Sequence, residues 1–304
     1  MVFCKYKERR ISMILQNIYD KGLIPGLPKF LLTNTHYLTI MGSQSYGTNN
    51  DDSDTDIYGF GIPPKEMIFP HLAGEIMGFS TPQTRFKHWE EHHIMDGKKE
   101  YDFSVYSIIN YFRLLMGNNP NVLDSIWTPI NCVVHCTSVG QMVRDNRKMF
   151  MHKGLFHKFR GYSFSQLHKM ETKDPKGKRK AIRDKYGWDV KFGMNVVRIL
   201  LEAEQLLETG ELDLQRYREM LKSIRRGEWT AQQVKDWFAT KEKHLDGLYQ
   251  TSKLPYGPDE EKIKELLLNC LEQHFGSLDK AIVVPNKLEN ALKQIKDICD
   301  KATT

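Results

Sequence analysis

The stretch from Met41 to Asp56 contains residue types that a phosphate-handling site needs. Gly42-Ser43 follows an alternating, β-rich segment, and Asp54 and Asp56 lie two positions apart shortly after it. Alternate residues of an extended strand point to one face, so the two carboxylates are expected side by side. The backbone at Gly42 and the hydroxyl of Ser43 could hold phosphate oxygens, because glycine has no Cβ to block a ligand.

The paired aspartates predict a divalent metal site. Neighbouring carboxylates raise each other's pKa unless a cation neutralises them, and Mg²⁺ prefers oxygen ligands. A third carboxylate would allow two ions about 3.5 to 4 Å apart. Asp102 is the candidate because it lies between Tyr101 and Phe103 in a half-buried strand pattern, where a lone charge is costly. We expect Asp54, Asp56 and Asp102 to hold two Mg²⁺ ions, with Mn²⁺ able to substitute; a solvated acidic turn is the alternative.

The elements that must position these residues form a mixed α and β pattern in the first third of the chain. Apolar residues at helical spacing predict an opening helix over 9–21, stopped by Gly22. Three extended segments follow, over 37–41, 57–62 and 101–103, with a turn signal at Asp96-Gly97. Ser104 is expected to cap a helix that runs to Met116.

After about residue 140 strand signals vanish and helical signals recur. Helices are expected over 191–207 and 261–274, and Thr230 with Gln233 makes a capping box that opens another. On the first of these helices, Lys191, Asn195, Arg198 and Glu202 share one face. We expect a catalytic domain over 1–135 and a helical nucleotide- and substrate-binding domain over 136–304.

The composition is that of a folded protein. Of the 304 residues, 40% are hydrophobic and 27% charged, which excludes disordered and collagen-like classes. No apolar run is long enough to span a membrane, and the N-terminus lacks a signal core, so we expect a cytoplasmic protein without a membrane partner. The five cysteines are too few and too scattered for a disulfide scaffold and are expected as buried thiols.

The net charge of +6 is unevenly distributed. Residues 144–191 contain fifteen Lys and Arg against five Asp and Glu, interleaved with aromatic residues such as Tyr162 and Phe164. The stretch 173–185 is expected to be a mobile basic loop because Pro175 and Gly177 break its periodicity. Such a composition suits phosphate contacts and base stacking, so RNA is the expected partner; a solvated basic face is the alternative.

These motifs together resemble a known family. Gly42-Ser43, Asp54-x-Asp56 and a distal Asp102 resemble the signature of the DNA polymerase beta nucleotidyltransferase superfamily, and Gly-Ser-x-x-Tyr-Gly at 42–47 looks like its RlaP branch, associated with RNA repair. The likeness covers most of residues 37 to 270. Its further motifs are Gly-Asn-Asn-Pro-Asn-Val-Leu-Asp at 117–124, Phe-x-Gly-Tyr-x-x-Ser-Gln at 159–166, Tyr-Gly-Trp-Asp-x-Lys at 186–191, Arg-Ile-Leu at 198–200, Leu-Glu-Thr-Gly-Glu-Leu at 207–212, Ile-Arg-Arg-Gly-Glu-Trp at 224–229 and Leu-Pro-x-x-Pro-Asp at 254–259.

The resemblance implies an α+β fold, with a polymerase-beta-type core of a short mixed sheet and flanking helices, followed by an all-helical domain. It implies a metal-dependent nucleotidyltransferase that moves a nucleoside monophosphate from a nucleoside triphosphate such as ATP to a hydroxyl and releases pyrophosphate. The acceptor would be RNA, either a tRNA or a cleaved RNA end. The nucleotide-binding residues it implies are Gly42, Ser43, Tyr46, Gln166, Lys191 and Arg198. Asn195 departs from the pattern, which has a histidine there.

Other interpretations of the sequence stay open. The acceptor could instead be a protein or small-molecule hydroxyl, or the chain could be a non-catalytic RNA-binding module. Neither the triphosphate nor the oligomeric state can be read from the sequence. His88 and His92, with His93 beside them, have a spacing that could bind zinc on a helix, but no third ligand is evident. Cys132 and Cys136 make only half of a zinc motif.

Overall fold

The computed structural model describes residues 14–49, 54–69, 72, 85–174, 176–279 and 295. These residues contain a five-stranded sheet in the order β3-β4-β2-β1-β5. Its strands are β1 (Thr35–Ile40), β2 (Thr55–Gly61), β3 (His88–Asp96), β4 (Lys99–Ser107) and β5 (Val133–Cys136). β2 and β4 run parallel, and the other neighbouring pairs are antiparallel. The short mixed sheet expected from the sequence is therefore present.

The β3-β4 hairpin turns where the sequence predicts it, but β4 is longer than expected. Asp96 pairs with Lys99 across the turn, and β4 pairs with β2 as far as Ser107. The predicted cap at Ser104 is therefore wrong: Ser104 lies inside the strand, and Ser107 accepts the hydrogen bond from Asn110 N that opens α5 (Ile108–Met116). Strand pairing over the whole length of β2 decides where the helix begins.

Helices cover both faces of the sheet. On one face, helical residues 14–20 and α2 (Leu31–Asn34) pack on Leu38, Ile57 and Phe103; residues 9–13 of the predicted opening helix lie outside the described residues. On the other face, α5, α6 (Pro120–Trp127) and α7 (Ser138–Asp145) pack on Tyr37 and Phe60. The short helices α3 (Gly42–Ser45) and α4 (Lys65–Ile68) follow β1 and β2, and two 3-10 turns span Ile130–Cys132 and Arg147–Phe150.

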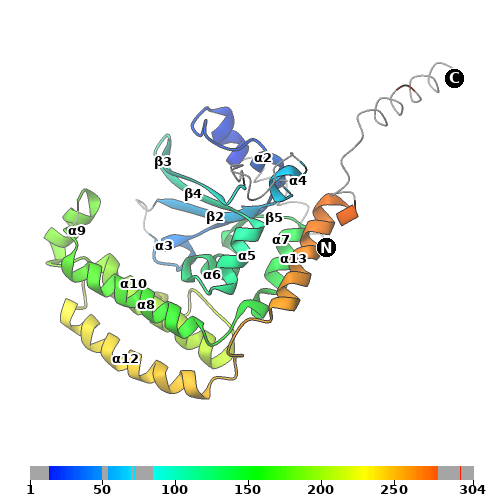
Figure 1. The fold of residues 1–304 in the computed structure, drawn as a ribbon. Coiled ribbons are helices and arrows are strands. Elements are labelled where there is room, and N and C mark those ends of the chain that lie inside the picture. Colours follow the sequence, from blue (N-terminus) through cyan, green and yellow to red (C-terminus); the bar gives the residue numbers. More distant parts are fainter. Residues whose placement is uncertain are drawn as a thin grey trace, which may run out of the picture.

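The second half of the chain is helical, as predicted. Figure 1 shows its long helices stacked side by side beyond the sheet. The stack consists of α8 (Leu155–Thr172), α10 (Val190–Thr209) and α12 (Ala231–Thr251). The other helices of this half are α9 (Lys178–Tyr186), α11 (Arg218–Arg225) and α13 (Glu260–Phe275). Asp189 caps α10, and the predicted capping box of Thr230 and Gln233 opens α12. The predicted mobile loop is wrong for residues 178–185, because they form most of α9.

The last helix leaves this stack and packs beside the sheet, next to α7 (Figure 1). His274 Nδ1 of α13 lies 2.9 Å from His36 Nε2 of β1, and Gln273 donates a hydrogen bond to Ser138 of α7. α13 therefore connects the end of the described chain to the sheet. Among the described helices, none combines the length and apolarity that crossing a membrane requires.

Candidate active site

The three aspartates predicted from the sequence lie in one cleft of about 520 Å³. In the parallel pair of β2 and β4, Asp56 is the direct partner of Asp102, so their side chains leave the same face of the sheet. Asp54 precedes β2 by one residue and lines the same cleft. We call these three residues the acidic wall. The structure brings Asp102 beside Asp54 and Asp56, which lie more than forty positions before it in the sequence.

The electrostatics of the acidic wall fit a divalent cation. Burial, followed by the charges of Asp102 and Asp54, raises the pKa of Asp56 to about 6, against the opposing charges of Lys191 and His92. Among the described residues, the three carboxylates do not form a group whose ligand atoms all lie within 4.8 Å of one another. A cation bound by the three carboxylates would relieve the repulsion between their charges, and an all-carboxylate donor set suits Mg²⁺ or Mn²⁺.

Gly42 brings α3 against the acidic wall. Its φ is +64°, and a methyl group at this position would lie 2.1 Å from Asp56 Oδ2. Met41 N also donates a 2.7 Å hydrogen bond to the backbone oxygen of Asp56. Only glycine fits this close approach without displacing the carboxylate. Gly42 and Ser43, both predicted to contact phosphate, line the cleft beside the aspartates.

A bulge in β3 holds Asp102. The register of β3 against β4 shifts between Glu91 and Ile94, and His93 has a φ of +58°. His93 N donates a 2.7 Å hydrogen bond to Asp102 Oδ1, and His92 Nδ1 lies 3.6 Å from Asp102 Oδ2. The helical spacing considered for a zinc site is therefore absent, because these histidines lie on a strand. No sequence pattern predicted this bulge.

Basic residues line the same cleft as the acidic wall. They include Lys191 of α10, Arg179 of α9 and Arg225 of α11, and the predicted contact of Lys191 with the triphosphate stays a prediction. Burial and the two arginines lower the pKa of Lys191, and Asp56 and Asp54 oppose this shift. Arg179 donates a 3.0 Å hydrogen bond to Asp189 and lies over the ring of Phe192. We call Arg179, Lys191 and Arg225 the basic wall; the sequence predicted only Lys191.

Tyr46 and Arg198, both predicted to bind nucleotide, line the cleft but belong to a buried network. Arg198 donates to Asp124 Oδ2 at 2.7 Å and to Glu202 Oε1 at 2.8 Å, while the Tyr46 hydroxyl donates to Asp124 Oδ2 at 2.8 Å. Burial raises the pKa of Glu202 to about 8. The carboxylates of Asp124 and Glu202 therefore both bind Nη1 of the Arg198 guanidinium. A direct contact with nucleotide stays a prediction for both residues.

Of two further residues considered from the sequence, Gln166 and Asn195, only Asn195 lines the cleft. Gln166 lies half-buried on α8 and is not among the described residues that line the cleft, so its contact with a base stays a prediction. Asn195, which stands where the family pattern has a histidine, does line the cleft. The face of α10 shared by Lys191, Asn195 and Arg198 therefore looks into the cleft, which spacing alone could not decide.

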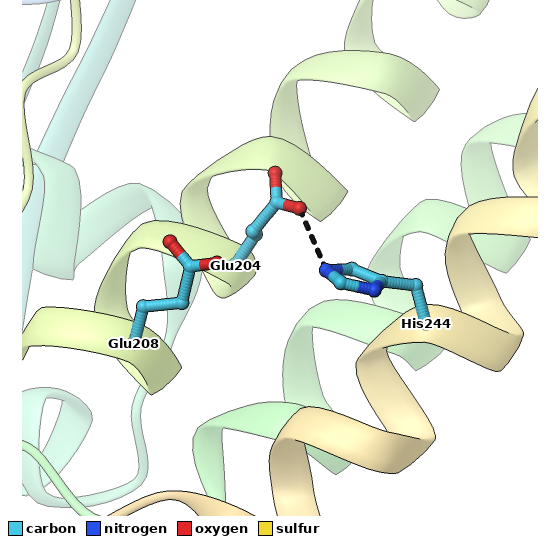
Figure 2. A group of neighbouring side chains, drawn as sticks. All are labelled: Glu204, Glu208 and His244. Atoms are coloured by element: carbon cyan, nitrogen blue, oxygen red, sulfur yellow. Dashed lines mark ion pairs between the residues drawn. The ribbon is translucent and has the colours of Figure 1, made fainter.

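Another group of possible ligands lies outside the cleft. Figure 2 shows Glu204 and Glu208 of α10 with His244 of α12, whose ligand atoms lie within 4.8 Å of one another. Lys241 Nζ is 2.7 Å from Glu204 Oε1, and His244 Nε2 is 3.1 Å from the same oxygen. Because Lys241 already neutralises the buried Glu204 carboxylate, we interpret this group as an ion-pair network. Cys132, Cys136 and Cys270 are buried, as predicted; Cys4 and Cys299 lie outside the described residues.

A family model and two known proteins are similar to this chain. A family model described as RlaP, the RNA repair pathway DNA polymerase beta family, matches residues 10–269. An uncharacterized 38.9 kDa protein from the nrdC-mobD intergenic region of Enterobacteria phage T4 is 31% identical over 111 residues, 36% of this chain and 31% of that protein. The match thus spans about a third of that relative's length. A crystal structure of a nucleotidyltransferase-like protein from Exiguobacterium sibiricum 255-15 matches at 10% identity and a TM-score of 0.29, over 86% of this chain and 80% of that chain.

Proposed function

The chain belongs to the RlaP family, the RNA repair pathway DNA polymerase beta family, and is a nucleotidyltransferase; we propose that it transfers a nucleoside monophosphate from a nucleoside triphosphate to a hydroxyl of RNA. The observation that carries this proposal is the pairing of an acidic wall with a basic wall in one cleft. Carboxylates suit metal ions at the reacting phosphate, and cations suit the phosphates that leave.

The reaction exchanges a phosphoanhydride bond for a phosphoester bond. The acceptor hydroxyl oxygen forms a bond to the α-phosphorus, and the bond from that phosphorus to the oxygen bridging to the β-phosphate breaks. Pyrophosphate leaves with the electron pair of that bond, and the acceptor proton passes to a carboxylate of the acidic wall. Arg179, Lys191 and Arg225 would hold the β- and γ-phosphates and stabilise the charge that develops on pyrophosphate.

Divalent ions are the cofactor that this site suits. Asp54, Asp56 and Asp102 would hold Mg²⁺ or Mn²⁺, which would neutralise the triphosphate and lower the pKa of the acceptor hydroxyl. Gly42 and Ser43 lie beside the aspartates, where backbone can approach the triphosphate closely. In the proposed division of the chain, residues 1–135 supply the acidic wall, and residues 136–304 supply the basic wall.

Transfer of label from each radiolabelled triphosphate tests this function. The wild type should label a discrete band of total cellular RNA with Mg²⁺ or Mn²⁺ present. Asp54→Asn and Asp56→Asn should each lower the rate by about 100-fold or more, because several kcal/mol of metal stabilisation are lost. Asp246→Asn, an exposed position on α12, is the control and should keep full activity.

A melting experiment separates loss of chemistry from loss of folding. The pKa of Asp56 is raised in the folded protein, so its carboxylate destabilises the fold above about pH 6. Asp56→Asn should therefore melt at a higher temperature than the wild type in metal-free buffer at pH 7. Undiminished turnover in this variant contradicts the metal site. Label in protein in place of RNA contradicts the acceptor, and RNA binding without any label indicates a non-catalytic module.

A further inference from the structure

A second groove begins at the edge of the catalytic cleft. It holds about 450 Å³ and is bounded by α5, the turn from α5 into α6, and the first turns of α8. Its polar and aromatic lining residues include Arg113, Asn119, His157, Lys158 and Tyr162. We call it the α8 groove. A volume of this size is within the range of roughly 300 to 1,000 Å³ that ligand pockets occupy.

The α8 groove and the catalytic cleft share a border on two sides. Asn119 and Pro120 line the groove, while Asn121, the next residue of α6, lines the cleft. Across from them, Tyr58 lines the cleft and Tyr162 lines the groove. Burial raises the pKa of Tyr58, and Tyr162 is close enough to add to that shift. A chain that leaves the acidic wall can therefore continue into the α8 groove.

The charge of the α8 groove fits a polyanion. Arg113 and Lys158 line it, and no Asp or Glu is among its lining residues. Both cations are exposed, and within the part of the chain that the structure describes neither forms an ion pair with a carboxylate. Arg160 on the same helix differs, because it is paired with Glu242. Two uncompensated cations are therefore available to phosphates in this groove.

The aromatic residues of α8 divide into two groups. Phe156 and Phe159 are 3% and 0% exposed and belong to the core, so they are not available for stacking on bases. Tyr162 is 36% exposed and lines the groove together with the two cations. An exposed ring beside uncompensated cations is the arrangement with which proteins hold single-stranded nucleic acid.

We propose that the α8 groove holds the single-stranded end of the acceptor RNA, with Arg113 and Lys158 on its phosphates and Tyr162 stacked on a base. This inference rests on the proposed function and adds the path of the acceptor to it. The terminal hydroxyl would lie at the acidic wall, and the preceding nucleotides would pass Tyr58 and α6 into the groove. An acidic peptide would satisfy the two cations but would leave the tyrosine ring without a base to stack on.

Binding of a short fluorescein-labelled single-stranded RNA by the full chain tests the path, measured by anisotropy from about 50 to about 200 mM KCl. Tyr162→Ala should weaken binding about 10-fold, and Tyr162→Phe should bind like the wild type because the ring remains. Arg113→Ala with Lys158→Ala should flatten the slope of log affinity against log salt by about 1.4, from two lost phosphate contacts. The matched control is Lys243→Ala with Lys253→Ala, two exposed lysines outside the groove, which should leave binding and slope unchanged.

The outcomes separate this inference from the proposed function. Calorimetry with a nucleoside triphosphate and Mg²⁺ should give wild-type affinity in all four variants, because none changes a residue of the catalytic cleft. If the groove variants bind RNA like the control while the wild type still labels RNA, the path is wrong and the function stands. If the wild type labels no RNA but the groove variants lose RNA binding, the groove stands and the function is wrong. Displacement of the RNA by a glutamate peptide at equal concentration overturns the groove as an RNA site.

Discussion

Two glycines with the same backbone conformation allow a matched test of the acidic wall. Gly42 and Gly97 have φ of +64° and +65°, but only at Gly42 would a methyl group meet another atom, Asp56 Oδ2 at 2.1 Å. Each Gly→Ala change pays a backbone cost of about 1 kcal/mol. Gly42→Ala must in addition displace the Asp56 carboxylate. We expect it to reduce transfer by about 100-fold, whereas Gly97→Ala keeps activity with a slightly lower melting temperature.

Steady-state transfer rates and thermal melting of the two variants check this expectation side by side. Equal activity of Gly42→Ala and Gly97→Ala would mean that the position of the Asp56 carboxylate does not matter for catalysis. Equal melting temperatures of the two variants would not affect the comparison of their transfer rates, because the methyl group of Gly42→Ala collides with one side chain, Asp56, at the surface of the cleft.

At the level of single residues, the sequence identifies the acidic wall better than the basic wall. Asp54 and Asp56 are revealed by their spacing, because period 2 fixes the relative direction of neighbours in a strand. Arg179 and Arg225 have no such local signal. They reach the cleft only because α9 and α11 both pack around the start of α10, and that packing depends on contacts between distant segments.

Among the elements, α10 is fixed to the sheet side of the cleft through Arg198. This side chain is 6% exposed and bonds two carboxylates, Asp124 of α6 and Glu202 of its own helix. Because both carboxylates are buried, they depend on the Arg198 guanidinium to neutralise their charge. The pair aligns α10, which presents Lys191, with α6, which borders the α8 groove.

Arg198→Met should therefore destabilise the protein by about 3 to 5 kcal/mol, because it leaves two buried carboxylates without a cation. Lys241→Met is the comparison: its partner Glu204 is also buried but keeps His244 Nε2 at 3.1 Å, so the loss should be smaller, about 1.5 to 3 kcal/mol for one hydrogen bond to a charged group. Urea unfolding at pH 7 measures both. A loss below about 1 kcal/mol for Arg198→Met would show that the network is not what holds α10 in place.

Element boundaries were harder to predict than element types. Ser104 and Ser107 are equivalent as local helix caps, and the choice between them depends on how far β4 pairs with β2. The segment 173–185 has the proline, glycine and charge of a loop, yet its second half forms α9, where Arg179 gains a partner in Asp189 and packs on the ring of Phe192. In both cases tertiary contacts outweigh local preference.

At the scale of the whole molecule, α13 closes the fold by packing the end of the described chain on the sheet. His36 of β1 is buried, and its two ring nitrogens face Thr137 and His274. The other titratable group near it is His135 of β5. A neutral imidazole donates with one ring nitrogen and accepts with the other, whereas a protonated one only donates. The contact between His36 and His274 is therefore lost when both rings are protonated.

Acidification should therefore loosen α13. Burial, His274 and His135 lower the pKa of His36 to about 3, so between pH 6.5 and 3 the unfolded chain binds more protons than the folded one, and stability falls as pH falls. The expected loss is roughly 2 kcal/mol between pH 6.5 and pH 5. Urea unfolding at the two pH values measures it, and His36→Gln should flatten the dependence while His157→Gln, an exposed position on α8, should not. Hydrogen exchange places the effect: if the amides of α13 and β1 exchange no faster at pH 5 than expected from the intrinsic rates, the histidine pair does not control this contact.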